Sequence, residues 1–76
     1  MADNVIPLRT QHVDRILRRP EVERRTGLSR SAIYRRIADK TSDFPAPLDL
    51  GGNAVGWRES AIEHWLATRP ISTATP

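Results

Sequence analysis

The 76-residue sequence contains no cysteine, few aromatic residues and no long apolar run. Without cysteine, a disulfide framework, a thiolate zinc site and a thiol nucleophile are excluded. No segment approaches the roughly 18 apolar residues of a membrane span, and residues 1–11 lack the apolar core of a signal peptide. A chain this short predicts one domain with a small core and no deep enzyme pocket. These absences predict a cytoplasmic protein that does not contact a membrane.

The two histidines of the sequence, His12 and His64, give no support for a metal site. Neither has a partner at metal-ligand spacing. A serine, a histidine and an aspartate can be combined on paper into a catalytic triad, but nothing in the sequence supplies an oxyanion hole or a pocket. We therefore expect no metal, no cofactor and no enzymatic activity.

Positive charge is concentrated in one part of the chain. The formal net charge is only +3, yet residues 15–36 carry eight arginines against two glutamates, and the rest of the chain is slightly acidic. A basic segment is typical of proteins that bind polyanions, because each neutralised phosphate releases counterions. The alternative is a solvated helix surface. The eight arginines are Arg15, Arg18, Arg19, Arg24, Arg25, Arg30, Arg35 and Arg36.

The same segment carries the signals of two short helices joined by a tight turn. Pro20 suits the first turn of a helix, and Gly27 suits the left-handed position that ends one. Ser29 is a good N-cap for a second helix. The pattern predicts helices over residues 20–26 and 29–39, in the order that a helix-turn-helix needs to place a helix against DNA.

The second predicted helix has a face suited to reading DNA bases. Ile33 and Ile37 are four residues apart and mark the buried side, so Ser31 and Arg35 point directly away from it, with Tyr34 beside them. Arg35 is the candidate for base readout, because a guanidinium bonds guanine O6 and N7 together. Ser31 either contacts a base or phosphate or acts as a local cap. Tyr34 either reaches the DNA or packs on the helix pair.

Other arginines are candidates for phosphate contacts, which fix the protein on the duplex without reading sequence. Arg18 and Arg30 are assigned to phosphates. Arg36 and Arg58 have two open readings, since each is within reach of either a phosphate or a carboxylate. The carboxylates in question are Glu21 and Glu23 for Arg36, and Glu59 and Glu63 for Arg58. The predicted DNA contacts are Arg18, Arg30, Ser31, Tyr34, Arg35, Arg36 and Arg58.

Beyond the two helices, the pattern changes from helical to extended and back. Alternating apolar residues on both sides of a Gly-Gly-Asn turn predict a short β-hairpin over residues 48–57. Apolar residues at helical spacing predict a last helix over about residues 59–68. Trp57 and Trp65 are the largest apolar groups available and are expected in the core.

Together these segments resemble the AlpA family of prophage-type regulators, which is related to phage excisionases and to the winged DNA-binding domain of MerR-like proteins. The resemblance covers about residues 15–69. It implies an α+β, mostly α, fold: a small winged helix-turn-helix with a two-helix unit, a short β-hairpin wing and a C-terminal helix. The motifs are Pro20-Glu21-Val22, Thr26-Gly27-Leu28-Ser29-Arg30-Ser31, Ile33-Tyr34-Arg35, Phe44-Pro45-x-Pro47 and Gly56-Trp57-Arg58-Glu59-Ser60-x-Ile62-x-x-Trp65-Leu66.

The composition of the two ends predicts a division of the chain, and the resemblance implies a function. Residues 14–69 are expected to form the DNA-binding domain, between a flexible arm at 1–13 and a flexible tail at 70–76. The implied function is sequence-specific binding of double-stranded DNA, as a transcriptional regulator or as an accessory factor that bends DNA and favours excision by an integrase. Repeated half-sites and the transcription machinery are further expected partners, and the oligomeric state stays open. The alternative is a protein-interaction module whose basic face binds a regulator, recombinase or polymerase subunit.

The sequence departs from the family pattern at three positions. Ala46 and Asn53 stand where basic residues are frequent, so the wing is expected to contribute little charge to DNA binding. Arg19 stands where an apolar residue is usual, which implies either a looser core edge or an added phosphate contact.

Overall fold

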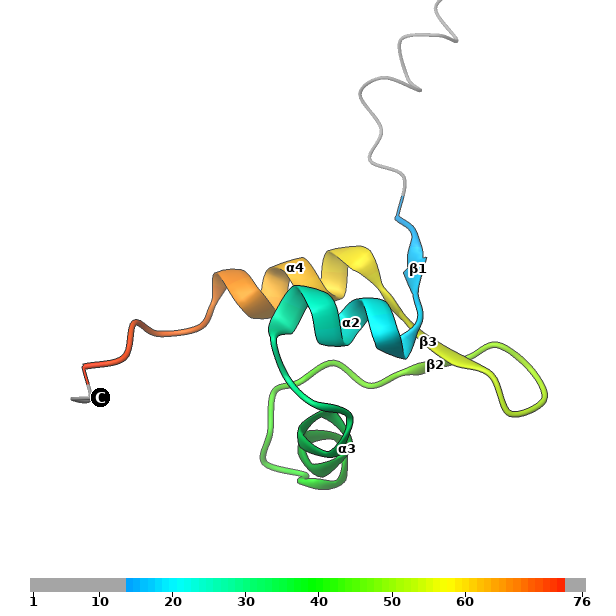
Figure 1. Ribbon diagram of the computed structural model, residues 1–76, viewed down its shortest axis with the longest axis horizontal. Helices are drawn as coiled ribbons and strands as arrows, with labels where there is room; N and C mark the ends of the chain where they lie inside the picture. The colour runs from blue at the N-terminus through cyan, green and yellow to red at the C-terminus, as the bar shows by residue number, and fades with distance from the viewer. Residues whose placement is uncertain (1–13, 74–76) are drawn as a thin grey trace, which may run out of the picture.

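Three helices and a three-stranded antiparallel sheet make up the computed structural model, which describes residues 14–73 (Figure 1). The predicted α+β, mostly helical class and the winged helix-turn-helix arrangement are confirmed. The predicted arm at 1–13, and residues 74–76 of the predicted tail, lie outside the described residues. None of the helices between residues 14 and 73 is long and apolar enough to cross a membrane.

The helix-turn-helix consists of α2 (Arg19–Thr26) and α3 (Arg30–Ala38), close to the predicted ranges. Gly27 ends α2 with a left-handed φ of 75°, and its backbone N–H donates to the Glu23 carbonyl. This conformation is strained for residues with a Cβ atom, which explains the glycine. Ser29 then caps α3, since its hydroxyl oxygen accepts a hydrogen bond from the Ala32 N–H at 3.1 Å. Local chemistry therefore sets the turn between the two helices.

The sheet has the strand order β1, β3, β2, with β1 at Ile16–Leu17, β2 at Leu48–Asp49 and β3 at Val55–Arg58. The predicted hairpin is confirmed as β2 and β3. Strand β1 was not predicted, because two residues are too few to show an alternating pattern. It exists through its pairing with β3, in which Leu17 lies opposite Trp57.

Gly56 lies where β1 and the hairpin come closest together. A Cβ atom on this residue would lie 2.5 Å from Cγ2 of Ile16 and 3.2 Å from Cδ1 of Leu50. The first distance is too short for non-bonded carbon atoms, and the second is tighter than an ordinary van der Waals contact. A side chain at this position would therefore force Ile16 to move, which glycine avoids.

The core lies between the helices and the sheet, and the expected burial of Trp57 and Trp65 is confirmed. The loop between α3 and β2 is hydrogen-bonded to the indole rings of both tryptophans. The Trp57 N–H donates to the Pro45 carbonyl, and the Trp65 N–H donates to the Asp43 carboxylate, each at 3.0 Å. The buried residues are Leu17, Val22, Ile33, Phe44, Trp57, Ile62 and Trp65.

The last helix, α4 (Glu59–Ala67), is capped by a residue far away in the sequence. Asp14 accepts hydrogen bonds from the backbone N–H and the hydroxyl of Ser60, at 2.9 and 2.8 Å. A carboxylate at this end satisfies a free N–H and complements the helix dipole. The bonds attach Asp14, two residues before β1, to the start of α4.

Candidate nucleic-acid interface

Helix α3 presents one buried and one exposed side, as helical geometry predicts. Ile33 is fully buried and Ile37 is half-buried against the core, whereas Ser31 and Arg35 are exposed. Figure 1 looks along α3 from its end, with α2 and α4 to one side of it and the hairpin turn projecting beyond the helices. The side of α3 turned away from its neighbours is therefore open to a ligand.

The three guanidinium groups of α3 are not neutralised within the described chain. Arg30, Arg35 and Arg36 form no ion pair with any residue between 14 and 73. The guanidinium carbon of Arg30 lies 5.9 Å from the centre of the Tyr34 ring, and that of Arg36 lies 5.5 Å from the centre of the Trp65 ring. An aromatic face stabilises a cation without cancelling its charge. The positive charge of α3 is therefore available to an anion.

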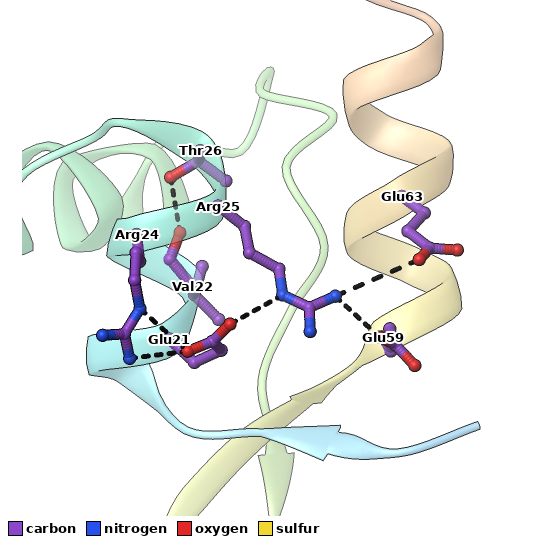
Figure 2. A network of polar contacts seen from close by, with 7 residues as sticks. All are labelled: Glu21, Val22, Arg24, Arg25, Thr26, Glu59 and Glu63. Atoms are coloured by element: carbon purple, nitrogen blue, oxygen red, sulfur yellow. Dashed lines mark hydrogen bonds and ion pairs between the residues drawn. The ribbon is translucent and has the colours of Figure 1, made fainter. Parts of the chain in front are cut away.

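The arginines of α2, in contrast, are paired with carboxylates. Glu21 accepts hydrogen bonds from Arg24 at 2.6 Å and from Arg25 at 2.9 Å (Figure 2). The bonds from Arg25 and Arg24 hold the pKa of the Glu21 carboxyl below its usual value. Glu23 pairs with Arg19 one turn away. All three guanidinium groups thus face acids of their own helix.

Arg25 also connects α2 to α4. Its Nη1 donates to the Glu59 carboxylate at 2.6 Å, and Glu63 lies 4.0 Å from the same nitrogen. Figure 2 shows this guanidinium between the two helices, with Glu21 on one side and the α4 carboxylates on the other. Its contacts with Glu21 and Glu59 raise its pKa above the usual arginine value. Arg25 therefore stabilises the scaffold that supports α3.

The structure shows none of the carboxylate pairings that the sequence suggested for Arg36 and Arg58. Arg36 pairs with neither Glu21 nor Glu23: its guanidinium lies over the Trp65 ring, and those acids pair with arginines of α2. Arg58 lies 3.6 Å from Asp14, while Glu59 and Glu63 face Arg25. At Arg19, where an apolar residue is usual in the family, the guanidinium pairs with Glu23.

A surface hollow joins α3 to the hairpin. It is bordered by Tyr34 of α3, Arg18 at the start of α2, and Asn53 in the hairpin turn. The Arg18 Nε donates to the Val55 carbonyl at 2.9 Å, which ties the residue before α2 to β3. Sequence reasoning missed the position of Asn53, because a Gly-Gly-Asn turn does not reveal which helix it will approach.

The structure brings most of the predicted contacts together and leaves one apart. Tyr34 lies beside both Arg30 and Arg18. Arg58 is the last residue of β3, directly before α4, and the junction of these two elements lies on the far side of α2 from α3 in Figure 1. Tyr34 is 40% exposed, so its ring is only partly packed against the helix pair. The described residues hold no group of three side chains that could bind a metal ion.

Comparisons with known proteins found a family model and relatives that match most of the chain. The family model described as "Prophage CP4-57 regulatory protein (AlpA)" matches residues 15–70. The uncharacterized protein ORF88 of Enterobacteria phage P4 is 42% identical over 65 residues, which cover 86% of this chain and 72% of that protein. The DNA-binding transcriptional activator AlpA of Escherichia coli (strain K12) is 41% identical over 59 residues, covering 72% of this chain and 84% of that protein. No solved structure matches the chain.

Proposed function

The chain belongs to the AlpA family, and on this basis we propose that it binds double-stranded DNA in a sequence-specific manner as a regulator of a prophage or integrative element. The observation that carries the proposal is the exposed side of α3, where Arg30 and Arg35 form no ion pair with any residue between 14 and 73. A relative named as a DNA-binding transcriptional activator supports the same reading. We propose residues 14–69 as the DNA-binding unit.

In this proposal, α3 enters the major groove and reads base edges. Arg35 has no ion pair to break with any residue between 14 and 73, and its guanidinium is suited to bond guanine O6 and N7. Ser31, four residues earlier on the same face, reaches a base or a phosphate near the start of the helix. Tyr34 borders the hollow between α3 and the hairpin, and we propose that it contacts either a phosphate through its hydroxyl or a thymine methyl group through its ring.

Phosphate contacts around this face hold the protein on the duplex. Arg30 is placed at the start of α3, where the helix dipole also favours an anion. Arg18 lies at the border of the hollow between α3 and the hairpin turn, beside Asn53. Arg58, whose guanidinium lies 3.6 Å from Asp14, is proposed as a more remote phosphate contact.

A module of this size makes few DNA contacts. Each phosphate contact contributes about 0.9 to the slope of the logarithm of affinity against the logarithm of salt concentration, so binding weakens steeply as salt rises. We therefore propose that stable occupancy requires adjacent half-sites or a protein partner, such as an integrase or the transcription machinery. In this proposal, the partner determines whether the bound protein controls transcription or promotes excision.

The test is selection of duplexes from a random-sequence pool by the wild-type protein, followed by affinity measurements over a salt series. We expect one sequence to be enriched, and Arg35→Ala to abolish most of the preference for it. Arg24→Ala is the matched control, since it removes an arginine from α2 that is paired with Glu21. No enrichment and no duplex binding at low salt would refute the proposal and favour the alternative, in which the basic face binds an acidic protein surface.

A further inference from the structure

Trp65 of α4 contacts both the end of α3 and the loop that follows α3. The residue is 5% exposed, its indole N–H donates to the Asp43 carboxylate at 3.0 Å, and its ring makes a T-shaped contact with Phe44, with ring centres 4.9 Å apart. Two guanidinium carbons lie over the same ring, that of Arg69 at 4.3 Å from its centre and that of Arg36 at 5.5 Å. Trp65 is therefore a platform shared by α3, the loop and the end of α4.

The two guanidinium groups on this platform differ in their charge partners. Arg69 pairs with Asp43, and its Nε donates to the Trp65 carbonyl at 2.9 Å. The contacts from Arg69 and the Trp65 indole hold the pKa of the Asp43 carboxyl below its usual value, so this carboxylate stays charged. Arg36 has no side-chain hydrogen bond or ion pair between residues 14 and 73, and its contact is with the Trp65 ring.

The two ends of α3 are held in different ways. At the first end, the Gly27 turn and the Ser29 cap connect α3 directly to α2. At the other end, the backbone leaves through Asp39 in an extended conformation and runs through a long loop before β2 begins. Arg36 lies in the last turn of α3, where its side chain spans the distance to α4.

We propose that Arg36 is a positioning residue, which sets the orientation of α3 through the Trp65 ring instead of neutralising a phosphate. This inference rests on the proposed function, because orientation matters only if α3 reads a duplex. A helix that tilts in the groove misplaces its base contacts, while its phosphate contacts adjust more easily. Loss of Arg36 therefore reduces discrimination between sequences and leaves the salt dependence unchanged.

The experiment compares Arg36→Gln with Arg30→Gln, which removes the same charge at the other end of α3. The probes are a 20-base-pair duplex enriched by the wild type from a random pool and a scrambled duplex of equal composition. For Arg36→Gln we expect the affinity ratio of the two duplexes to fall by about two- to fivefold, the size of a cation–π contact, with an unchanged salt slope. For Arg30→Gln we expect a salt slope lower by about 0.9 and an unchanged ratio.

Two further measurements separate positioning from a general loss of structure. Arg36→Lys keeps a cation over the ring, so it is expected to restore most of the affinity ratio. The protein has two tryptophans and hence two indole N–H signals in NMR spectra. Arg36→Gln is expected to shift the Trp65 signal and leave that of Trp57 in place, whereas Arg30→Gln shifts neither.

The outcomes distinguish this inference from the proposed function. A salt slope lowered by about 0.9 with an unchanged affinity ratio would make Arg36 a phosphate contact and overturn the inference. An unmoved Trp65 signal in Arg36→Gln would overturn it as well. If the wild type enriches no duplex, the proposed function fails, and the NMR comparison still tests the contact between Arg36 and Trp65.

Discussion

Helices α2 and α3 each carry three arginines, but only those of α2 are paired with acids. In α2, Glu21 and Glu23 lie three or four residues from Arg19, Arg24 and Arg25, so the pairs form within one helix. Helix α3 contains no acidic residue, and its guanidinium groups stay available. The number of arginines in a segment therefore says less about a binding surface than the spacing of the acids among them.

The same difference distinguishes α2, whose arginines stabilise the fold, from α3, whose arginines are proposed to contact DNA. Arg25 connects α2 to Glu59 of α4, so its charge stabilises the arrangement that holds α3 in place. Arg35 of α3 contributes no ion pair to the described structure and is proposed to act on a ligand. Four predictions test whether stability and DNA binding divide between the helices in this way.

The largest effect is expected when arginines are removed from one helix or the other. Arg30→Ala combined with Arg35→Ala is expected to weaken binding to the selected duplex by about 100-fold, because a base contact and a phosphate contact are lost together. Arg24→Ala combined with Arg25→Ala removes the same charge from α2 and is expected to lower the urea unfolding midpoint instead. Equal losses of affinity in the two double variants would contradict the comparison.

A tenfold loss of DNA affinity is expected when an acidic residue is introduced into α3 at the spacing found in α2. Ser31→Glu places a carboxylate four residues before Arg35, the spacing that separates Glu21 from Arg25. We expect affinity for the selected duplex to fall about tenfold relative to Ser31→Gln, which has the same shape without the charge. The unfolding free energy should not decrease, since an acid is favourable in a first helical turn. Unchanged duplex affinity would show that Arg35 does not act on DNA.

A smaller effect concerns how each helix begins. Ser29 accepts a hydrogen bond at the start of α3, whereas Arg18 provides no side-chain cap for α2. Ser29→Ala is expected to lower the free energy of unfolding by about 1 kcal/mol in urea denaturation. Ser31→Ala, two residues later, removes a hydroxyl that forms no hydrogen bond with residues 14–73 and should cost less than about 0.5 kcal/mol. Equal costs would show that the Ser29 cap does not stabilise α3.

The smallest effect is the pH dependence that the acids of α2 introduce. Because the pKa of Glu21 is lowered in the folded protein, its stabilisation is complete above the unfolded-state pKa of about 4.3 and is lost as pH falls through the folded-state pKa. Glu21→Gln is therefore expected to narrow the difference in urea midpoint between pH 7 and pH 3. Part of the difference should remain in this variant, because Asp39 and Asp43, whose pKa values are also lowered, still stabilise the folded protein more at pH 7 than at pH 3. A difference as large as in the wild type would refute a role for Glu21.

Much of the candidate site could be predicted from the sequence, because it lies on one helix with strong local signals. Gly27, Ser29 and the spacing of Ile33 and Ile37 determine where α3 begins and which side faces the core. From there, the exposure of Arg35 follows from helical geometry. The partners of Arg36 and Arg58 did not follow, since an arginine side chain is long enough to reach several acids.

By itself, the sequence determined the helix-turn-helix, the hairpin and the burial of the tryptophans, because caps, turns and periodicity act between residues close together in the chain. Only the tertiary structure decided the features that join distant residues: the β1 pairing, the Asp14 cap on α4 and the bridge from Arg25 to Glu59. It also placed Arg36 over Trp65, far away in the sequence. Such contacts leave no local pattern, since they depend on where packing brings separate elements together.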